Sequence, residues 1–183
     1  MKQKELILIF GGSRSGKSEF AEELAAAHGG KVCYLATGVV MDSEMKERVE
    51  KHQQRRSPHW QTLEEPLNPI KALETLKDYN GILLMDSLSG WLANLLYQHP
   101  WGAFPWGPKE ETEALAKVES FLEKLKEASH SSLVVGDEVG MGLVPQTPEG
   151  RAFRDLNGKA NQLTAAVAHH VYFVIAGQPL KIK

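Results

Sequence analysis

Eight consecutive residues near the N-terminus carry the clearest chemical pattern of this sequence. Their spacing, G-x-x-x-x-G-K-[ST], is typical of loops whose backbone N–H groups surround phosphate oxygens. The lysine of such a loop reaches the β- and γ-phosphates, and the hydroxyl that follows it binds Mg²⁺. The residues are Gly11, Gly12, Ser13, Arg14, Ser15, Gly16, Lys17 and Ser18. The sequence therefore predicts a nucleotide site with Lys17 as a catalytic residue and Ser18 as a metal ligand.

The segments on either side of this loop support the same interpretation. The apolar run Leu6–Phe10 precedes the loop, and the Ala- and Glu-rich segment Ser18–His28 follows it. A strand before and a helix after are the context that the motif requires, and the helix directs its positive dipole end at the bound anion. A chance glycine-rich turn is therefore the less favoured interpretation.

Loops of this kind normally work with a carboxylate at the end of a strand, which holds Mg²⁺ directly or through water. Asp86 follows one apolar run, and Asp137 and Glu138 follow another. Each carboxylate also fits a helix cap or a turn, so both interpretations stay open. The tetrapeptide from Asp137 to Gly140 matches the D-x-x-G pattern of signalling GTPases, but the chain has no Asn-Lys-x-Asp motif for reading guanine. We therefore do not expect that class.

A helix that combines a histidine with arginines is predicted from Asp42 to Arg56, with acids in its first turn. At about 100° per residue, one arc of this helix holds Met45, Arg48, Val49, His52 and Arg56. An amphipathic surface helix with solvated arginines explains this pattern, and periodicity alone favours it. The alternative is a cationic face over the nucleotide, in which neutral His52 attacks phosphorus and the arginines stabilise the developing charge.

Short apolar runs alternate with helical patterns along the rest of the chain, which favours an α/β fold with a mostly parallel sheet flanked by helices. The runs are typical of strands buried on both faces, and they cover 6–10, 32–36, 82–85, 133–135 and 171–176. Further helices are expected from Asn68-Pro69 to near Gly81, over about 109–129, and over the stripe from Phe153 to Val167. The stretch 99–108, which contains Trp101 and Trp106, is expected to be a surface loop or lid.

Composition limits the functional classes. The 183 residues fit one domain, 1–183, and 42% hydrophobic and 24% charged residues are close to the globular average. With a net charge of −2 and no block of Lys or Arg, we expect no nucleic-acid-binding surface. The single cysteine, Cys33, lies in an apolar run and fits a buried position in a reducing compartment. Because no stretch is long enough to cross a membrane and the first apolar run is too short for a signal peptide, we expect a cytoplasmic protein.

Several separated motifs, in a fixed order over nearly the whole chain, are far more specific than the phosphate loop alone. They are Gly11–Ser18, Tyr34–Thr37, Arg48–His52 with Arg56, Trp60–Glu64, Trp91–Leu96, Glu138–Pro145, Phe153–Asp155 with Asn161-Gln162, and Gly177–Lys183. In this combination the sequence resembles the bifunctional adenosylcobinamide kinase/adenosylcobinamide-phosphate guanylyltransferase family of cobalamin biosynthesis.

The resemblance implies two successive reactions. In the first, ATP or GTP phosphorylates the aminopropanol hydroxyl of adenosylcobinamide. In the second, GTP guanylylates a histidine with release of pyrophosphate, and the GMP passes to adenosylcobinamide phosphate to give adenosylcobinamide-GDP. His52 matches that histidine, which reverses the preference that periodicity gave. The resemblance further implies Mg²⁺, a RecA-like P-loop fold and a homotrimer.

The same matching implies which residues contact the nucleotide. Besides the phosphate loop they are Ala36, Thr37, Gly38, Gln53, Gln54, Arg55, Arg56, Glu64 and Asp86. Glu64 and Asp86 match acidic positions that bind GTP or its metal, and Asp86 is the metal ligand we expect beside Ser18.

Some positions depart from the family pattern. The proline after the histidine is displaced by one residue, in Arg56-Ser57-Pro58, and Asp137 stands where Asn or Ser is more familiar. These departures leave the substrate fit and the choice between ATP and GTP open. Two other classes remain as alternatives: a P-loop kinase for another small alcohol, and a nucleotide-switched binding protein. Neither requires a histidine on a basic helix.

Overall fold

The computed structural model describes residues 4–39, 47, 56–97 and 106–183. The strands of these ranges are β1 (Leu6–Gly11), β2 (Lys31–Ala36), β3 (Gln61–Glu64), β4 (Gly81–Asp86), β5 (Ser131–Asp137), β6 (His170–Ile175) and β7 (Gln178–Lys181). The helices are α1 (Lys17–Ala27), α3 (Pro69–Thr75), α4 (Leu88–Leu96), α5 (Pro108–Glu127) and α6 (Pro148–Val167).

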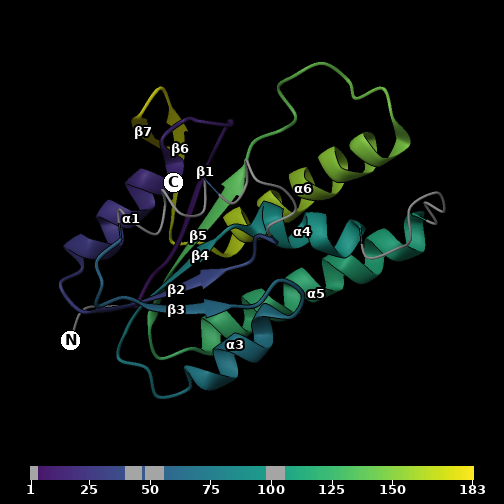
Figure 1. Cartoon of the computed structure of the whole chain (residues 1–183). Coiled ribbons are helices and arrows are strands. Elements are labelled where there is room, and N and C mark those ends of the chain that lie inside the picture. Colours follow the sequence, from purple (N-terminus) through teal and green to yellow (C-terminus); the bar gives the residue numbers. More distant parts are fainter. Residues whose placement is uncertain (1–3, 40–46, 48–55, 98–105) are drawn as a thin grey trace.

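All these strands belong to one sheet with the order β3-β2-β4-β5-β1-β6-β7. Every neighbouring pair is parallel except β6 and β7, which form an antiparallel hairpin at the end of the chain. The carboxyl ends of the parallel strands therefore meet at one edge of the sheet (Figure 1). In open α/β sheets this edge is where ligands bind.

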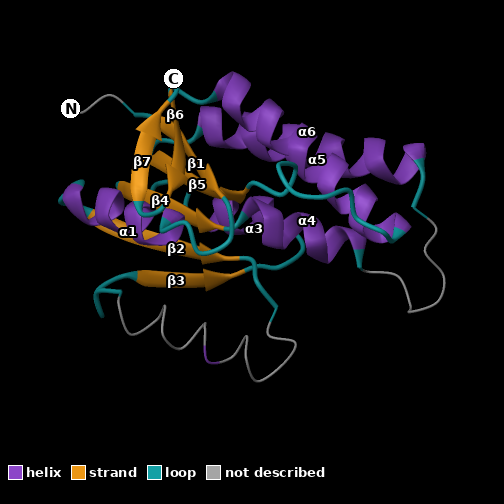
Figure 2. Cartoon of the chain, turned by 90° about the horizontal axis from the view of Figure 1, so that it is seen from above, coloured by secondary structure: helices purple, strands orange, loops and turns teal. Residues whose placement is uncertain are grey.

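Helices cover both faces of the sheet, so its central strands are apolar on both sides. In β4, Ile82 and Leu84 face the core under α1, whereas Leu83 and Met85 face the core under α3 to α6. All four side chains are at most 4% exposed. Figure 2 shows α1 on one side of the sheet and the other four helices on the opposite side. The predicted α/β fold with a mostly parallel, helix-flanked sheet is confirmed.

The structure adds three elements to those expected from the sequence. Helix α4 begins two residues after β4 ends, and the apolar stretch that includes both elements indicated only the strand. Strands β3 and β7 lie at the two edges of the sheet, where most of their residues are exposed and no apolar run marks them. Helix α3 is also shorter than expected, because it ends at Thr75 rather than near Gly81.

Two other expectations are only partly covered by the described residues. The predicted histidine-containing helix lies outside them, apart from Glu47 and Arg56, and Arg56 itself is in a bend rather than a helix. The stretch expected as a surface loop or lid lies outside them up to residue 105. Beyond it, Trp106 packs against the core and Pro108 already begins α5. Cys33 is fully buried, as expected.

Candidate nucleotide site

The phosphate loop joins β1 to α1 and adopts a backbone that needs glycine at two positions. Gly16, immediately before α1, has φ 92°, a left-handed conformation that strains residues with a Cβ atom. At Gly11 a Cβ atom would collide with the carbonyl oxygen of Val174 in β6 and would lie 2.7 Å from the Ser15 hydroxyl. The two glycines therefore serve different purposes, one a backbone turn and the other close packing against the neighbouring strand.

Neighbouring segments hold this loop from both sides. The N–H of Glu138, just after β5, donates to Gly11 O at 2.9 Å. On the other side the N–H of Gly177, in the β6–β7 turn, donates to Ser15 O at 2.7 Å. Because backbone groups from two other strands fix it, the loop is shaped before any phosphate binds.

Lys17 points from the first turn of α1 toward the end of β5. Its ammonium lies 2.7 Å from Asp137 Oδ1 and donates to Gly12 O at 3.2 Å. The lysine side chain is 12% exposed and the Asp137 side chain 34% exposed. In this structure the ammonium of Lys17 therefore forms an ion pair with Asp137. Lys17 is the residue that the sequence predicts to bind the phosphates.

A buried hydrogen-bond network fixes the end of β5 that carries Asp137. Asn157 and Asn161 of α6 both donate to the Asp137 carbonyl, at 2.7 and 2.9 Å. Ser89 of α4 accepts from the Asp137 N–H at 2.7 Å and donates to Asn157 Oδ1 at 2.7 Å. Ser89 and Asn157 are 2% and 1% exposed. Sequence reasoning missed Ser89 and Asn157, because a Ser or Asn inside a helix has no pattern that points to a strand end.

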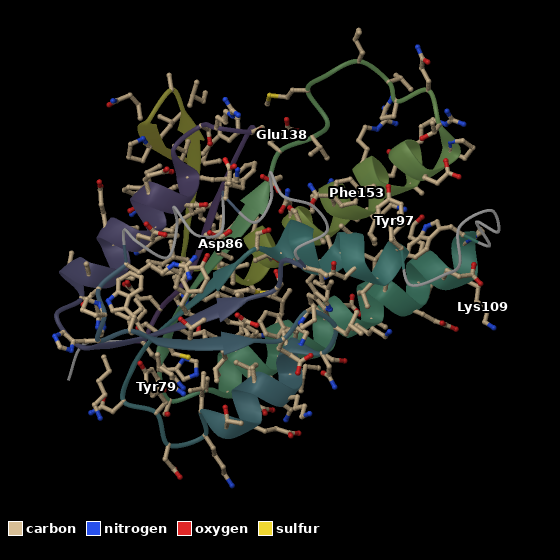
Figure 3. The ribbon with its side chains drawn as sticks, viewed as in Figure 1. Tyr79, Asp86, Tyr97, Lys109, Glu138 and Phe153 are labelled. Carbon is tan, nitrogen blue, oxygen red and sulfur yellow. The ribbon has the colours of Figure 1, made fainter. Side chains whose placement is uncertain are left out.

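Asp86 ends β4, with β5 between it and the phosphate-loop strand. Its Oδ2 accepts a hydrogen bond of 2.9 Å from the Tyr34 hydroxyl of β2. Burial raises the pKa of Tyr34 far above its ordinary value, and the charge of Asp86 raises it further. The phenol therefore stays protonated and orients the carboxylate by donating to it. Figure 3 shows Asp86 beside the phosphate-loop end of the sheet.

Arg56 contacts Tyr34, the residue that orients Asp86, and Glu22 of α1. Its guanidinium carbon lies 3.3 Å from the centroid of the Tyr34 ring, a cation–π contact. Its Nε lies 3.7 Å from Glu22 Oε1 of α1, and the two side chains are only 9% and 11% exposed. The role of Arg56 as a nucleotide contact remains a prediction, since here its charge faces Tyr34 and Glu22.

Thr37 and its neighbours form the strand end beside Asp86. Thr37 is fully buried, and its hydroxyl donates to Ser87 O at 2.6 Å and accepts from Ser87 N at 2.9 Å. The side chain of Asn94 donates to the Thr37 carbonyl at 2.7 Å. Ala36 is partly buried, whereas Gly38 is exposed. The Thr37 hydroxyl thus supports the turn after β4, and the contacts of Ala36, Thr37 and Gly38 with a nucleotide remain predictions.

Glu64 lies at the far edge of the sheet. It ends β3, which is four strands from β1 in the sheet order, and it is exposed. At about 4.8 Å between strands, this separation is roughly 19 Å. Glu64 therefore lies far across the sheet from the phosphate loop, and its role as a nucleotide contact remains a prediction.

The remaining predicted residues divide into two groups. Ser13 and Arg14 of the phosphate loop are exposed, and Ser18, one residue into α1, is partly exposed. His52, Gln53, Gln54 and Arg55 lie outside the described residues.

The donor set fits Mg²⁺ carried by a nucleotide. Mg²⁺ prefers oxygen ligands and is usually held by one or two carboxylates together with substrate phosphates and waters. The Ser18 hydroxyl and the Asp86 carboxylate are oxygen donors at the same edge of the sheet. Within the described ranges, no group of three or more His, Cys, Asp and Glu side chains forms a ready-made metal cage. A metal at this edge would therefore take most of its ligands from phosphate and water.

Comparison with known proteins decides the family. A family model described as cobinamide kinase / cobinamide phosphate guanyltransferase matches residues 7–182. The chain belongs to this family.

Full-length relatives agree with this assignment. The bifunctional adenosylcobalamin biosynthesis protein CobU of Escherichia coli (strain K12) is 34% identical over 181 residues, which cover 97% of this chain and 99% of that protein. The bifunctional adenosylcobalamin biosynthesis protein CobP of Pseudomonas aeruginosa is 40% identical over 96% of each chain. CobU of Salmonella typhimurium is 32% identical over 97% of this chain and 99% of the relative.

A solved structure supports the P-loop fold. A prototypical ATPase from the type III secretion system of pathogenic bacteria matches with a TM-score of 0.52 and 14% sequence identity. The match covers 97% of this chain, and the chain spans 56% of that ATPase. At this identity the likeness concerns the fold alone.

Among the helices of the described residues, none is long and apolar enough to span a bilayer.

Proposed function

We propose that this chain phosphorylates adenosylcobinamide with ATP or GTP and then transfers GMP from GTP to adenosylcobinamide phosphate. The observation that carries the proposal is the family match over 7–182, in a chain whose phosphate loop, Lys17 and Asp86 meet at one edge of the sheet. A cytoplasmic homotrimer, as the family resemblance implies, is part of the proposal.

The kinase step requires positioning more than covalent chemistry. The backbone N–H groups of the loop hold the β-phosphate, and the positive end of α1 faces it. Lys17 leaves Asp137 and binds the β- and γ-phosphate oxygens, offsetting the charge that develops in the transfer. The acceptor oxygen forms a bond to the γ-phosphorus and its proton passes to solvent, while the bond from that phosphorus to the β-phosphate oxygen breaks and the nucleoside diphosphate leaves. Ser18 and Asp86 would hold Mg²⁺, whose positive charge would offset part of the charge of the phosphates.

The transfer step requires a nucleophile at the α-phosphorus, and we assign this role to His52. Its imidazole nitrogen forms a bond to the α-phosphorus while the bond to the β-phosphate oxygen breaks and pyrophosphate leaves. A phosphate oxygen of the phosphorylated acceptor then attacks the same phosphorus, and the histidine is released. Gln53, Gln54, Arg55 and Glu64 are the proposed contacts of the guanine nucleotide in this step.

Covalent labelling tests the transfer step. The full-length protein is incubated with Mg²⁺ and GTP labelled at the α-phosphate, denatured and measured by intact mass. We expect a GMP adduct that acid removes and base leaves intact, and that is lost in His52→Ala. His59→Ala is the matched control, because His59 is an exposed histidine seven residues away.

The kinase step is measured in the same variants by phosphorylation of cobinamide. His52→Ala should keep most of this activity, since the γ-phosphate reaction uses Lys17 rather than the histidine. Equal loss of both activities in a folded His52→Ala protein would refute this division. Labelling of wild type in the absence of any cobinamide phosphorylation would leave a guanylyltransferase without the kinase, and turnover of nucleotide with no acceptor product would refute both steps.

A further inference from the structure

The loop between β5 and α6 carries the most exposed large apolar side chains of the described residues. Met141, Leu143 and Val144 are 79%, 96% and 65% exposed and lie within four positions of one another. In Figure 1 this loop rises as an arch from the end of β5 and passes beside α6. Soluble proteins rarely expose such a cluster unless something binds to it.

Hydrogen bonds fix both ends of the arch. The conformation of the loop therefore keeps the side chains of Met141, Leu143 and Val144 exposed. At the start, the Glu138 carboxylate accepts from the N–H groups of Gly140 and Met141, at 2.7 and 3.2 Å. At the end, the Arg151 guanidinium donates to the carbonyls of Pro145 and Gln146, at 3.0 and 2.8 Å. The apolar residues between these anchors are held away from the core.

The start of the arch adjoins the phosphate loop directly. Glu138 N donates to Gly11 O, and the preceding residue, Asp137, pairs with Lys17. Figure 3 shows Glu138 at the upper end of β5, where the arch begins. A large molecule that covers the arch down to its start at Glu138 therefore reaches the residues around Lys17, which would bind the transferred phosphate.

Gly142, in the middle of the apolar cluster, is not required by the fold. A Cβ atom there would meet nothing within 4 Å, and its φ is not in the left-handed range. Within the described part of the chain, the backbones of Gly142, Leu143 and Val144 make no hydrogen bond to other residues. A glycine that the fold does not need, with unpaired backbone groups around it, suits close approach of a ligand to the backbone.

We infer that the arch 138–145 is the docking surface for the corrinoid acceptor, with Met141, Leu143 and Val144 against its macrocycle and the backbone at Gly142 bonded to its amide groups. The inference rests on the proposed function for the identity of the acceptor. A corrinoid has a large, methyl-rich ring with carboxamide side chains, so it needs apolar contact together with free N–H and C=O groups. The arch offers both, beside Lys17.

Two variants and two matched controls test the inference in the full-length protein. Gly142→Ala adds one methyl group at the proposed contact, and Gly158→Ala adds one at another position where nothing lies within 4 Å, in α6. Leu143→Ser removes the most exposed apolar side chain, and Ile182→Ser removes another that is 58% exposed and lies beside the start of β6. The readouts are KM for cobinamide in the kinase assay, Kd for GTP, and molar mass by light scattering.

Leu143→Ser should raise KM for cobinamide about tenfold, the loss expected when a polar side chain replaces an apolar one that the bound ligand would cover. Gly142→Ala should raise it several-fold, and both variants should keep the GTP Kd and the molar mass of wild type. The two controls should behave as wild type in every readout. An unchanged KM in both arch variants would overturn the inference.

The other outcomes are also decisive. A fall in molar mass of Leu143→Ser at matched concentration would show that the arch is a contact between copies of the chain, and would overturn the assignment to the acceptor. Equilibrium dialysis with cobinamide separates this inference from the proposed function. If wild type binds cobinamide without phosphorylating it, the proposed kinase step fails, and the variants are then compared by their cobinamide Kd. If wild type does not bind cobinamide at all, both fail.

Discussion

Two carboxylates lie at the same edge of the sheet and are held in different ways. Asp137, at the end of β5, pairs with the ammonium of Lys17 at 2.7 Å. Asp86, at the end of the neighbouring β4, accepts from the neutral phenol of Tyr34 at 2.9 Å. One carboxylate faces the cation that a phosphate needs, and the other is oriented by a group that carries no charge.

The difference indicates different roles when a nucleotide binds. Phosphates that bind Lys17 would compete with Asp137 for its ammonium, so this ion pair opposes nucleotide binding. The hydrogen bond from Tyr34 comes from a neutral group, so it orients the Asp86 carboxylate without removing its charge.

The largest effect is expected at Lys17, which pairs with Asp137 here and would bind phosphate in the complex with nucleotide. Lys17→Ala should lower kcat/KM of the kinase step at least about 100-fold, because a preorganised charge on the transferring phosphate is lost. It should also weaken GTP labelling if one loop serves both reactions. Steady-state kinetics with cobinamide and GTP measure this loss, and Lys124→Ala, an exposed lysine of α5, is the control. Undiminished kinase turnover in Lys17→Ala would exclude the loop from that step.

The second prediction concerns the metal. Asp86→Asn should lower kinase activity about tenfold or more at a fixed Mg²⁺ concentration, because the carboxylate is replaced by a neutral and weaker ligand. Part of the loss should be recovered as Mg²⁺ is raised. A titration of activity with Mg²⁺ measures this. The same titration curve for Asp86→Asn and Asp137→Asn would show that the two carboxylates do not differ as proposed.

Asp137→Asn is expected to act in the opposite direction. It removes the counter-ion of Lys17 but keeps the side-chain size, so Kd for GTP without Mg²⁺ should fall about three- to fivefold, the range of partly exposed ion pairs. Isothermal titration measures the change. Because the pair is electrostatic, the difference from wild type should shrink as salt is raised. Weaker GTP binding in the variant would mean that Asp137 supports the nucleotide rather than competes with it.

The smallest effect is expected when the hydrogen bond that orients Asp86 is removed and the charge of Asp86 is kept. Tyr34→Phe removes the hydrogen-bond donor and keeps the ring under Arg56, so unfolding free energy should fall by about 1 kcal/mol. The Mg²⁺ concentration for half-maximal activity should rise about two- to threefold, because Asp86 keeps its charge but loses its fixed orientation. Urea denaturation and the Mg²⁺ titration give the two values. A loss as large as that of Asp86→Asn would place the phenol itself in the metal site.

The sequence was sufficient for the features that depend on local order. The strand and helix on either side of Gly11–Ser18 were predicted because eight adjacent residues carry the whole pattern, whereas their binding of phosphate stays a prediction. The central strands were predicted because both faces of the sheet are covered, which requires continuous apolar runs. The buried position of Cys33 followed from the same runs.

The contacts that orient the strand ends were not predictable in the same way. Ser89 and Asn157 meet Asp137 from helices that lie 48 and 20 residues away in sequence. Tyr34 and Asp86 are 52 residues apart and belong to adjacent strands. Such pairs form only in one particular order of strands in the sheet, and the pattern of apolar runs does not predict this order. The edge strands escaped prediction for a related reason, since exposed strands need no apolar run.

The hydrogen bond from Gly177 N to Ser15 O joins the phosphate loop to the turn between β6 and β7, which is far from it in sequence. During synthesis the N-terminal segment leaves the ribosome first, yet β1 must wait for both of its partners, β5 and β6, to follow. A nascent chain that stops before the β6–β7 turn has every residue of the phosphate loop and the contact from Glu138, but it lacks the contact from Gly177. The full support of the loop is therefore acquired only after the β6–β7 turn has been synthesised.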